Sequence, residues 1–170
     1  MKVALMLPGH VAAGDVAAAA RRAERDGFDA VACGEHIFFH GPVPNAFVSL
    51  AAAAGATQRI RLLSALTVLP VYPVALAAKL AATLDRVSGG RLDLGVGIGG
   101  EYPPEFDAVG VPVRERGRRT DEALELLGLL FRGEPVDYAG RYTTLRGQRL
   151  APTPVQRPGP PVWIGGRREA

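Results

Sequence analysis

Residues 84–100 read LDRVSGGRLDLGVGIGG, and this stretch decides the fold. A helical run ends on the pair Gly89-Gly90, a short strand over 91–98 follows, and that strand becomes rich in glycine toward its C-terminal end. The glycines there are Gly95, Gly97, Gly99 and Gly100. Glycine weakens a strand because it loses more backbone freedom on folding and has no side chain to pack. The pattern therefore indicates either a flat or bulky group that approaches this backbone closely, or a tight bend or bulge in the sheet.

The same glycines formally match the dinucleotide-binding fingerprint, because Gly95, Gly97 and Gly100 have its G-x-G-x-x-G spacing. That fingerprint closes the first strand of its unit and opens a helix directly. Here several strand–helix units come first, and the residues that follow, 101–104 (EYPP), cannot begin a helix at once. We therefore reject a Rossmann nucleotide site at this position.

The rest of the chain alternates between strands and helices. Short apolar strands are predicted over 3–7, 28–33, 60–69, 91–98 and 162–164. Helices are predicted over 15–26, 45–57, 116–131 and from Pro73 to the Gly89-Gly90 pair. The helix that begins at Pro73 has a predicted apolar face of Leu76, Leu80, Leu84 and Val87. Strands that are apolar throughout are typical of parallel sheets covered by helices, so the sequence predicts an α/β protein.

Residues 134–161 interrupt this alternation. A small hairpin is predicted around 139–141, and several prolines between 152 and 161 indicate an extended connector. Because this segment lies between two units of the repeat, we interpret it as an insertion, and residues 1–170 as a single domain.

Two architectures fit five parallel strands in 170 residues. An open flavodoxin-like sheet matches the length, but it leaves the apolar strand over 162–164 poorly covered, because no helix follows it. A barrel of eight strand–helix units typically needs about 250 residues. We therefore predict a (β/α)8 barrel of the TIM type that is truncated after its fifth strand.

Composition excludes several classes of function. The formal net charge is only +3, and the densest group of arginines, within 114–119, is flanked by and interleaved with acidic residues, which argues against nucleic-acid binding. Proline, glycine or charge interrupts each apolar run, so we expect neither a membrane span nor a signal peptide. Cys33 is the single cysteine and lies in an apolar run, which fits a buried thiol in a protein of the reducing cytoplasm.

Candidate site residues follow the predicted strands, because parallel α/β folds work at the C-terminal ends of their strands. These segments are Pro8-Gly9, Glu35-His36, 64–67, 97–101 and Gly165-Gly166-Arg167. His36 is the histidine placed directly after a strand, and imidazole can move a proton near neutral pH, although a single loop histidine is most often a surface residue. The last segment is either a phosphate-binding turn or a plain turn that ends a strand. His36 and His40 lack an evident third ligand, so no metal site is predicted.

Motifs along nearly the whole chain are similar, in order, to those of one family. They are Ala23-Glu24, Gly27-Phe28-Asp29, Glu35-His36, the run 78–91 (AKLAATLDRVSGGR), the run 95–100, Glu105-Phe106, Gly110-Val111, Glu115-Arg116-Gly117, Asp121-Glu122, Gly140-Arg141-Tyr142, the run 152–156 (PTPVQ) and the run 160–166 (PPVWIGG). The chain resembles the bacterial luciferase-like monooxygenase family of flavin and deazaflavin oxidoreductases.

The resemblance implies a barrel with a flavin or deazaflavin ring at the C-terminal face of the strands. It implies catalytic roles for His36 and Glu101, the latter as a proton donor whose spacing is one residue longer than in some deazaflavin members. The residues implied in cofactor binding are Pro8, Gly9, Ser64, Ala65, Leu66, Thr67, Gly97, Gly99, Gly100, Gly165, Gly166 and Arg167. A distorted backbone is expected over 64–67, with a cis peptide at Ala65-Leu66, although Ala65 stands where many relatives have Ser.

Two functions remain open from the sequence. The first is a cytoplasmic oxidoreductase that uses coenzyme F420, or alternatively FMN, on a small organic substrate, with a homodimer as its expected assembly. The second is a non-catalytic barrel fragment that binds a cofactor weakly or serves only in assembly.

Overall fold

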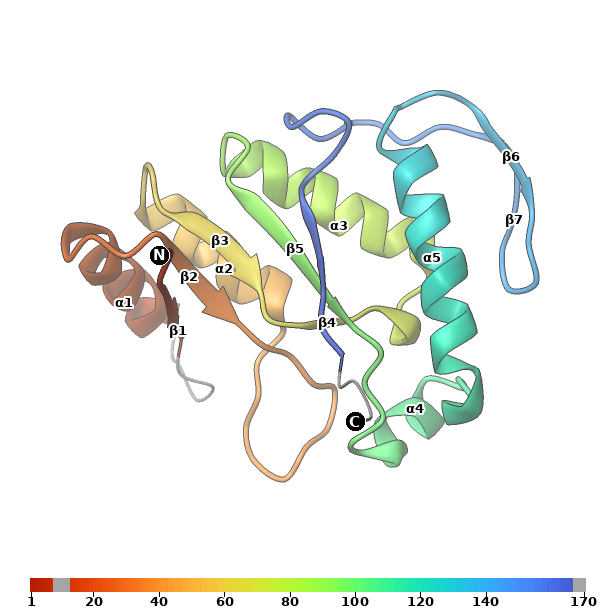
Figure 1. The fold of residues 1–170 in the computed structure, drawn as a ribbon, viewed down its shortest axis with the longest axis horizontal. Coiled ribbons are helices and arrows are strands. Elements are labelled where there is room, and N and C mark those ends of the chain that lie inside the picture. The colour runs from red at the N-terminus through yellow and green to blue at the C-terminus, as the bar shows by residue number, and fades with distance from the viewer. Residues whose placement is uncertain (8–12, 167–170) are drawn as a thin grey trace.

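The fold was analysed in a computed structural model that describes residues 1–7 and 13–166. Its elements, in chain order, alternate between strands and helices (Figure 1). They are β1 (Ala4–Met6), α1 (Ala13–Arg25), β2 (Ala30–Cys33), α2 (Ala46–Ala56), β3 (Arg61–Ser64), β4 (Thr67–Val68), the 3-10 turn η1 (Leu69–Val71), α3 (Val74–Val87), β5 (Leu92–Gly97), α4 (Pro103–Ala108), the 3-10 turn η2 (Val113–Glu115), α5 (Arg116–Leu130), β6 (Val136–Ala139), β7 (Thr144–Gln148) and β8 (Val162–Ile164). The predicted α/β class is confirmed.

The main sheet is parallel at each pairing of its strands. Its order is β1-β2-β3-β5-β4, and β8 also pairs with β5. The predicted strand over 60–69 is present as two pieces, β3 and β4, which pair with different stretches of β5: Leu62 lies opposite Leu92, and Thr67 lies opposite Val96. Strand positions therefore follow one another around the sheet in chain order, as they do in a (β/α)8 barrel.

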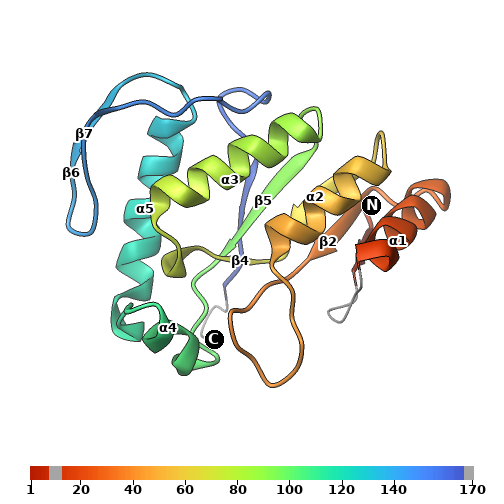
Figure 2. The ribbon, with the colours of Figure 1, turned by 180° about the vertical axis from the view of Figure 1, so that it is seen from behind.

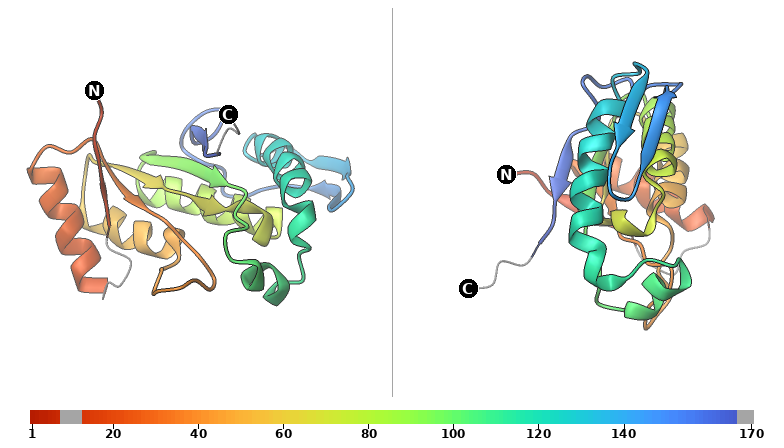
Figure 3. Two further views of the ribbon diagram at one scale, coloured as in Figure 1. Left: turned by 60° about the horizontal axis from the view of Figure 1, so that its bottom comes forward. Right: turned by 90° about the vertical axis from the view of Figure 1, so that its right-hand side faces the viewer.

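Helices α1, α2, α3 and α5 lie side by side and cover one face of this sheet, as Figure 2 shows from behind and Figure 3 from below. The core lies between helices and sheet, and its largest fully buried side chains include Leu50, Leu62, Leu92 and Leu127. Helix α2 begins where Asn45 caps it, since the Asn45 side chain accepts from the Val48 amide at 3.1 Å. No helix of the described residues is both long and apolar enough to cross a membrane.

The buried face of α3 differs from the predicted one. Leu84 is buried, but Leu76 is 48% exposed and Val87 is 61% exposed, so the predicted leucine face is wrong at both positions. Small side chains form much of the buried face instead, namely Ala77, Ala78, Ala81 and Ala82. Alanine lets the helix approach its neighbours closely. This close packing, rather than the hydrophobicity of the leucines, determines which face of α3 is buried.

Helix α4 was not predicted. It begins at Pro103, six residues after β5 ends at Gly97, with Pro103 and Pro104 in its first turn. Proline is favourable there because the first turn of a helix leaves its amides unpaired and proline has the required φ. Residues 98–102 separate the strand from the helix, so the helix does not follow the strand directly, but it begins inside 101–104, which was expected not to begin a helix at once.

The predicted hairpin is present as β6 and β7, which pair antiparallel. It is fixed to α5 because the Glu122 carboxylate accepts from the Arg141 amide at 2.7 Å and the Tyr138 hydroxyl donates to Glu125 at 2.8 Å. The connector that follows is held by the fully buried Asp85 of α3, which accepts from the Val155 amide at 2.7 Å. These contacts lead the chain from the hairpin back to β8 beside β5.

Candidate active site

A cavity of about 710 Å³ lies at the C-terminal ends of the parallel strands and brings most of the predicted site residues together. Its walls are Gly34, Glu35, His36, Val43, Ala65, Leu66, Val68, Gly97, Ile98, Gly99, Glu101, Arg116, Gly165 and Gly166. Cavities of this size commonly hold small molecules and cofactors. The location of the site was thus predictable from strand ends alone.

Three predicted residues lie behind the cavity wall. Ser64 is fully buried, and its Oγ donates to the Gly95 carbonyl and accepts from the Gly95 amide, both at 2.9 Å. Thr67 is fully buried in β4. Gly100 lies against Arg116, since a Cβ built on Gly100 would be 2.8 Å from its Nε. Ser64 therefore joins β3 to β5 beneath the site.

Three further predicted residues, Pro8, Gly9 and Arg167, lie outside the described residues.

The third barrel strand is distorted where it was predicted to be. The peptide between Ala65 and Leu66 is cis, and the sheet pairing is interrupted between β3 and β4. The Ser64 carbonyl approaches Gly95 so closely that a Cβ there would overlap its oxygen. Of the two explanations for the glycines of β5, the bulge in the sheet therefore accounts for Gly95.

The Leu66 side chain accounts for two other glycines. A Cβ on Gly97 would lie 3.2 Å from Leu66 Cδ1, and a Cβ on Gly165 would overlap the same atom. The Gly165 amide also donates to the Val96 carbonyl at 2.9 Å, which brings the turn at 165–166 beside β5. Leu66 thus fills the space between β5 and this turn and forms an apolar wall of the cavity.

His36 is held by a buried carboxylate that the sequence did not single out. Its Nδ1 lies 3.1 Å from both carboxylate oxygens of Glu105, which is fully buried in α4 and also accepts from the Ile37 amide at 3.1 Å. An ionised carboxylate only accepts hydrogen bonds, so Nδ1 carries a proton and Nε2 is left as the nitrogen available to a ligand. Glu105 therefore fixes both the position and the tautomer of His36.

The signal for Glu105 was the family motif Glu105-Phe106, to which sequence analysis gave no role in the site. Its partner is 69 positions away in the chain, and only the unpredicted helix α4 brings the two together.

Glu35 stabilises the loop that carries His36. Its buried carboxylate accepts from the Tyr72 hydroxyl at 2.9 Å, the Val68 amide at 3.1 Å and the Ala46 amide at 3.2 Å. Burial raises the pKa of the Glu35 carboxyl group, although the hydrogen bonds from these three donors act in the opposite direction. Burial, together with the nearby charge of Glu35, also raises the pKa of the Tyr72 hydroxyl group. Glu35 ties the loop that carries His36 to β4, α2 and η1.

Arg116 is a second residue to which sequence analysis gave no role in the site, since it stood out only in the motif Glu115-Arg116-Gly117 and in the arginine cluster within 114–119. Its Nη1 donates to the Val113 carbonyl at 3.0 Å, while its buried Nε has no hydrogen-bond partner among the described residues. A buried donor without a partner is costly, but this Nε packs against Gly100 and is not exposed to the cavity, so Arg116 can meet a ligand only with the other nitrogens of its guanidinium group. Glu101 lies exposed at the rim of the same cavity.

These features fit a planar, anionic or hydrogen-bonding cofactor. Leu66 offers an apolar wall, Arg116 offers its guanidinium group, and a Cβ on Gly166 would meet no atom within 4 Å, so that turn leaves open space. Among the described residues there is no group of three or more His, Cys, Asp or Glu side chains placed to hold a metal ion.

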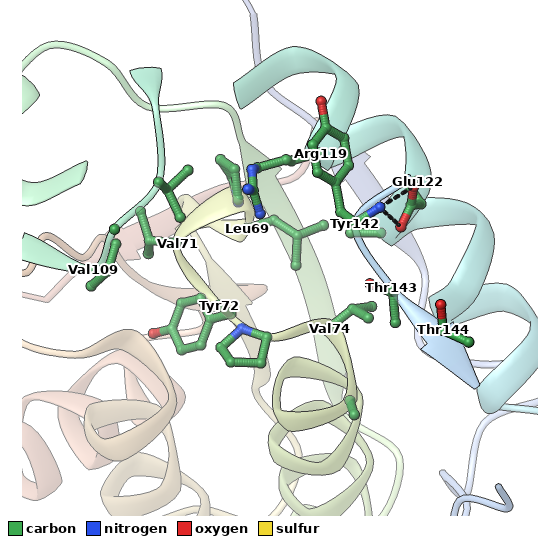
Figure 4. Close-up of a pocket in the computed structure, with 16 residues that line it drawn as sticks. Leu69, Val71, Tyr72, Val74, Val109, Arg119, Glu122, Tyr142, Thr143 and Thr144 are labelled. Carbon is green, nitrogen blue, oxygen red and sulfur yellow. Dashed lines mark hydrogen bonds between the residues drawn. The ribbon is translucent and has the colours of Figure 1, made fainter. Parts of the chain in front are cut away.

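A second cavity, of about 490 Å³, lies on the helix side of the sheet between η1, α5 and the hairpin (Figure 4). Its polar side chains already bind one another: the Arg119 guanidinium stacks 4.3 Å from the Tyr142 ring centre, and Glu122 accepts from the Tyr142 amide (Figure 4). These contacts attach the hairpin to α5, and His36 is not among the residues that line this cavity.

Comparisons with known proteins agree with the geometry. A family model described as luciferase-like monooxygenase matches residues 1–170. The oxygenase component of the flavin-dependent trigonelline monooxygenase of Acinetobacter baylyi is 32% identical over 149 residues, which cover 85% of this chain and 41% of that protein.

Solved structures give the same result. The monooxygenase RslO1 of Streptomyces bottropensis matches with a TM-score of 0.87 at 30% identity, over 96% of this chain and 53% of that one. An F420-dependent secondary alcohol dehydrogenase, solved with an F420–acetone adduct, matches with a TM-score of 0.82 at 28% identity, over 98% of this chain and 53% of that one. The chain thus spans about half the length of the relatives it matches. It belongs to the luciferase-like monooxygenase family.

Proposed function

We propose that this chain forms the cofactor-binding part of an oxidoreductase that uses reduced coenzyme F420 on a small organic substrate, with His36 transferring a proton. The observation that carries the proposal is the 710 Å³ cavity, which combines the His36–Glu105 pair, the rim carboxylate of Glu101 and an apolar, glycine-rich wall. Family membership supports the general reaction class, since members are monooxygenases or oxidoreductases.

Each residue of the cavity has a distinct part in this proposal. A reduced deazaflavin supplies a hydride when bound, and a reduced flavin supplies a hydride or activates dioxygen. His36 gives or accepts a proton at Nε2, and the Glu105 carboxylate compensates the positive charge whenever the ring holds both protons. Glu101, exposed at the rim, is the second proton donor. Leu66 excludes water from one side, and the Arg116 guanidinium group donates to an acceptor of the bound molecule.

FMN is the second candidate cofactor. The flavin-dependent relative from Acinetobacter baylyi supports it, whereas the F420-dependent alcohol dehydrogenase and the position of Glu101 support F420. The donors of the cavity fit the polar groups of either molecule.

An anaerobic titration tests the proposal. F420 and FMN are added to the protein, and binding is followed by absorbance, with sedimentation velocity to establish that the protein is compact. We expect micromolar binding of one cofactor. We also expect its reduced form to be oxidised when an organic compound that the protein converts is present. Failure of both cofactors to bind a compact protein would contradict the proposal and favour the non-catalytic alternative.

A further inference from the structure

A third cavity opens beside His36 and is lined by aromatic and apolar side chains. Its volume is about 470 Å³. Its walls are His36, Ile37, Phe38, Phe39, Gly41, Pro42, Val43, Tyr102 and Pro104. They come from the loop between β2 and α2 and from the start of α4, which meet at the lower end of the molecule in Figure 1. We refer to it below as the aromatic cavity.

The rings of the aromatic cavity are arranged around His36. The Phe39 ring stacks on the His36 ring with centres 4.1 Å apart and planes 13° apart. Tyr102 meets Phe39 edge-on at 6.3 Å, and it meets His40 edge-on at 5.2 Å. Stacked and edge-to-face geometries are the favourable ones for aromatic pairs. The site of proton transfer is therefore continuous with a wall of aromatic rings.

Three consecutive side chains of this wall are exposed although they are apolar. Ile37 is 45% exposed, Phe38 is 53% exposed and Phe39 is 39% exposed. Contiguous apolar surface of this kind is uncommon on a protein unless it meets a ligand or partner. Because these residues line a cavity of small-molecule size that shares His36 and Val43 with the 710 Å³ cavity, a small ligand is the occupant they fit.

The charge of the wall limits the chemistry of that ligand. Among the described residues that line the aromatic cavity, none has a carboxylate, ammonium or guanidinium group. An anion would lose its hydration there without a fixed cationic partner, whereas an aromatic ring would gain contacts with Phe39 and Tyr102, and the faces of these rings also attract a cation. His36 Nε2 is available for a single polar group of the ligand.

We propose that the aromatic cavity binds the substrate, and that the substrate is a molecule with a planar aromatic ring and without a negative charge. The assignment of this ligand as the substrate rests on the proposed function, but the binding of the ring does not require the cofactor. The ring stacks with Phe39 and Tyr102, and its polar group meets His36.

The test uses three molecules of matched shape on the protein without cofactor. Quinoline is uncharged near pH 7.5, quinoline-2-carboxylate is an anion and N-methylquinolinium is a cation. Saturation-transfer NMR and calorimetry measure their binding. We expect saturable binding of quinoline and of N-methylquinolinium, each at least about fivefold tighter than binding of the anion. Absence of saturable quinoline binding, or anion binding equal to or tighter than that of quinoline, would overturn the proposal.

Variants locate the binding. Phe39→Ala, Phe38→Ala and Tyr102→Ala are each expected to weaken quinoline binding about fivefold, while Leu76→Ala, which removes an apolar side chain 48% exposed on α3, leaves it unchanged. Thermal melts check that each variant is folded, and Phe38→Ala, at 53% exposure, is the least disruptive. Quinoline binding that persists in all three variants would place the ligand elsewhere and contradict the proposal.

The cofactor titration separates this inference from the proposed function. Quinoline binding without F420 or FMN binding would support the aromatic cavity and contradict the proposed cofactor. Cofactor binding without quinoline binding would do the reverse.

Discussion

His36 is held on one side by the carboxylate of Glu105 and on the other by the ring of Phe39. A charged hydrogen bond to a fully buried acceptor is stronger than one in water, and it leaves the imidazole few alternative orientations. At the scale of single residues, this pair and the guanidinium group of Arg116 are what distinguish the site from an ordinary loop.

Replacing Glu105 by Gln is expected to lower kcat by about tenfold to a hundredfold, because the neutral amide no longer compensates a positive charge on His36. The Kd of the cofactor should stay within about twofold, since Glu105 does not line the cavity. The free energy of unfolding, measured in urea, should fall by about 1–3 kcal/mol. The control is Glu115→Gln, which removes a carboxylate paired with Arg119 at 3.3 Å. Equal kcat in wild type and Glu105→Gln would refute the positioning role.

Replacing Arg116 by Met is expected to weaken cofactor binding about tenfold, because the guanidinium group that lines the cavity is lost, and to lower the melting temperature slightly, because the hydrogen bond from Nη1 to the Val113 carbonyl is lost. Arg118→Met, two residues along the same helix on an exposed position, is the matched control. Calorimetric titration of the cofactor into both variants tests this prediction. Similar cofactor affinity in the two variants would show that Arg116 does not bind the cofactor.

At the scale of elements, the distorted third strand and the glycines of β5 form one structural unit. The Ser64 carbonyl occupies the position that a side chain at Gly95 would need, and Leu66 occupies those at Gly97 and Gly165. The glycine-rich sequence therefore reflects close packing between strands, and the cavity begins on the far side of Leu66.

Gly95→Ala is expected to destabilise the protein by about 2–3 kcal/mol, because the added methyl overlaps the Ser64 carbonyl and forces the strands apart. Gly128→Ala in α5 provides the comparison: its Cβ would meet no atom within 4 Å, so it should stabilise the protein by about 0.5–1 kcal/mol. Urea denaturation measures both, and a Gly95→Ala protein as stable as wild type would show that the strands do not pack as described.

The start of β3 makes folding depend on pH. Glu24 of α1 accepts from the amides of Arg59 at 2.6 Å, Ile60 at 2.9 Å and Gln58 at 3.0 Å, and these hydrogen bonds lower the pKa of its carboxyl group. A carboxyl whose pKa is lower in the folded protein stabilises the fold above its unfolded pKa, and that stabilisation is lost as the pH falls through the folded pKa.

Glu24→Gln should therefore lower stability near pH 7, by about 0.5–1 kcal/mol once solvent screening is allowed for, and the difference should shrink toward zero in acid. Denaturation curves from pH 7 to about pH 2.5 test this, with the exposed Glu134→Gln as control. A difference from wild type that is independent of pH would show that the carboxylate charge is not involved.

At the scale of the whole molecule, the sequence predicted what depends on short-range pattern. Apolar runs identified the parallel strands, Asn45 marked the start of α2, and the strand ends identified the cavity that contains His36 and Gly97. These features follow from local propensity and from the geometry of parallel sheets.

What the sequence did not predict depends on contacts between distant segments. Glu105 became a partner of His36 only through α4, and Arg116 entered the cavity wall through the start of α5. The buried face of α3 depends on how closely alanine lets the helix approach its neighbours. The hydrophobicity of Leu76 and Val87 does not predict this.

The central claim is that the C-terminal ends of the strands hold the cofactor. Backbone amide NMR spectra recorded while oxidised F420 and then FMN are added to the protein test it most directly. The account predicts saturable shifts concentrated at Leu66, Gly97, Gly99, Glu101, Gly165 and Gly166, with small shifts at Tyr142 and Thr143 beside the second cavity. Shifts concentrated around Tyr142 and Thr143, or no saturable shifts with either cofactor, would contradict it.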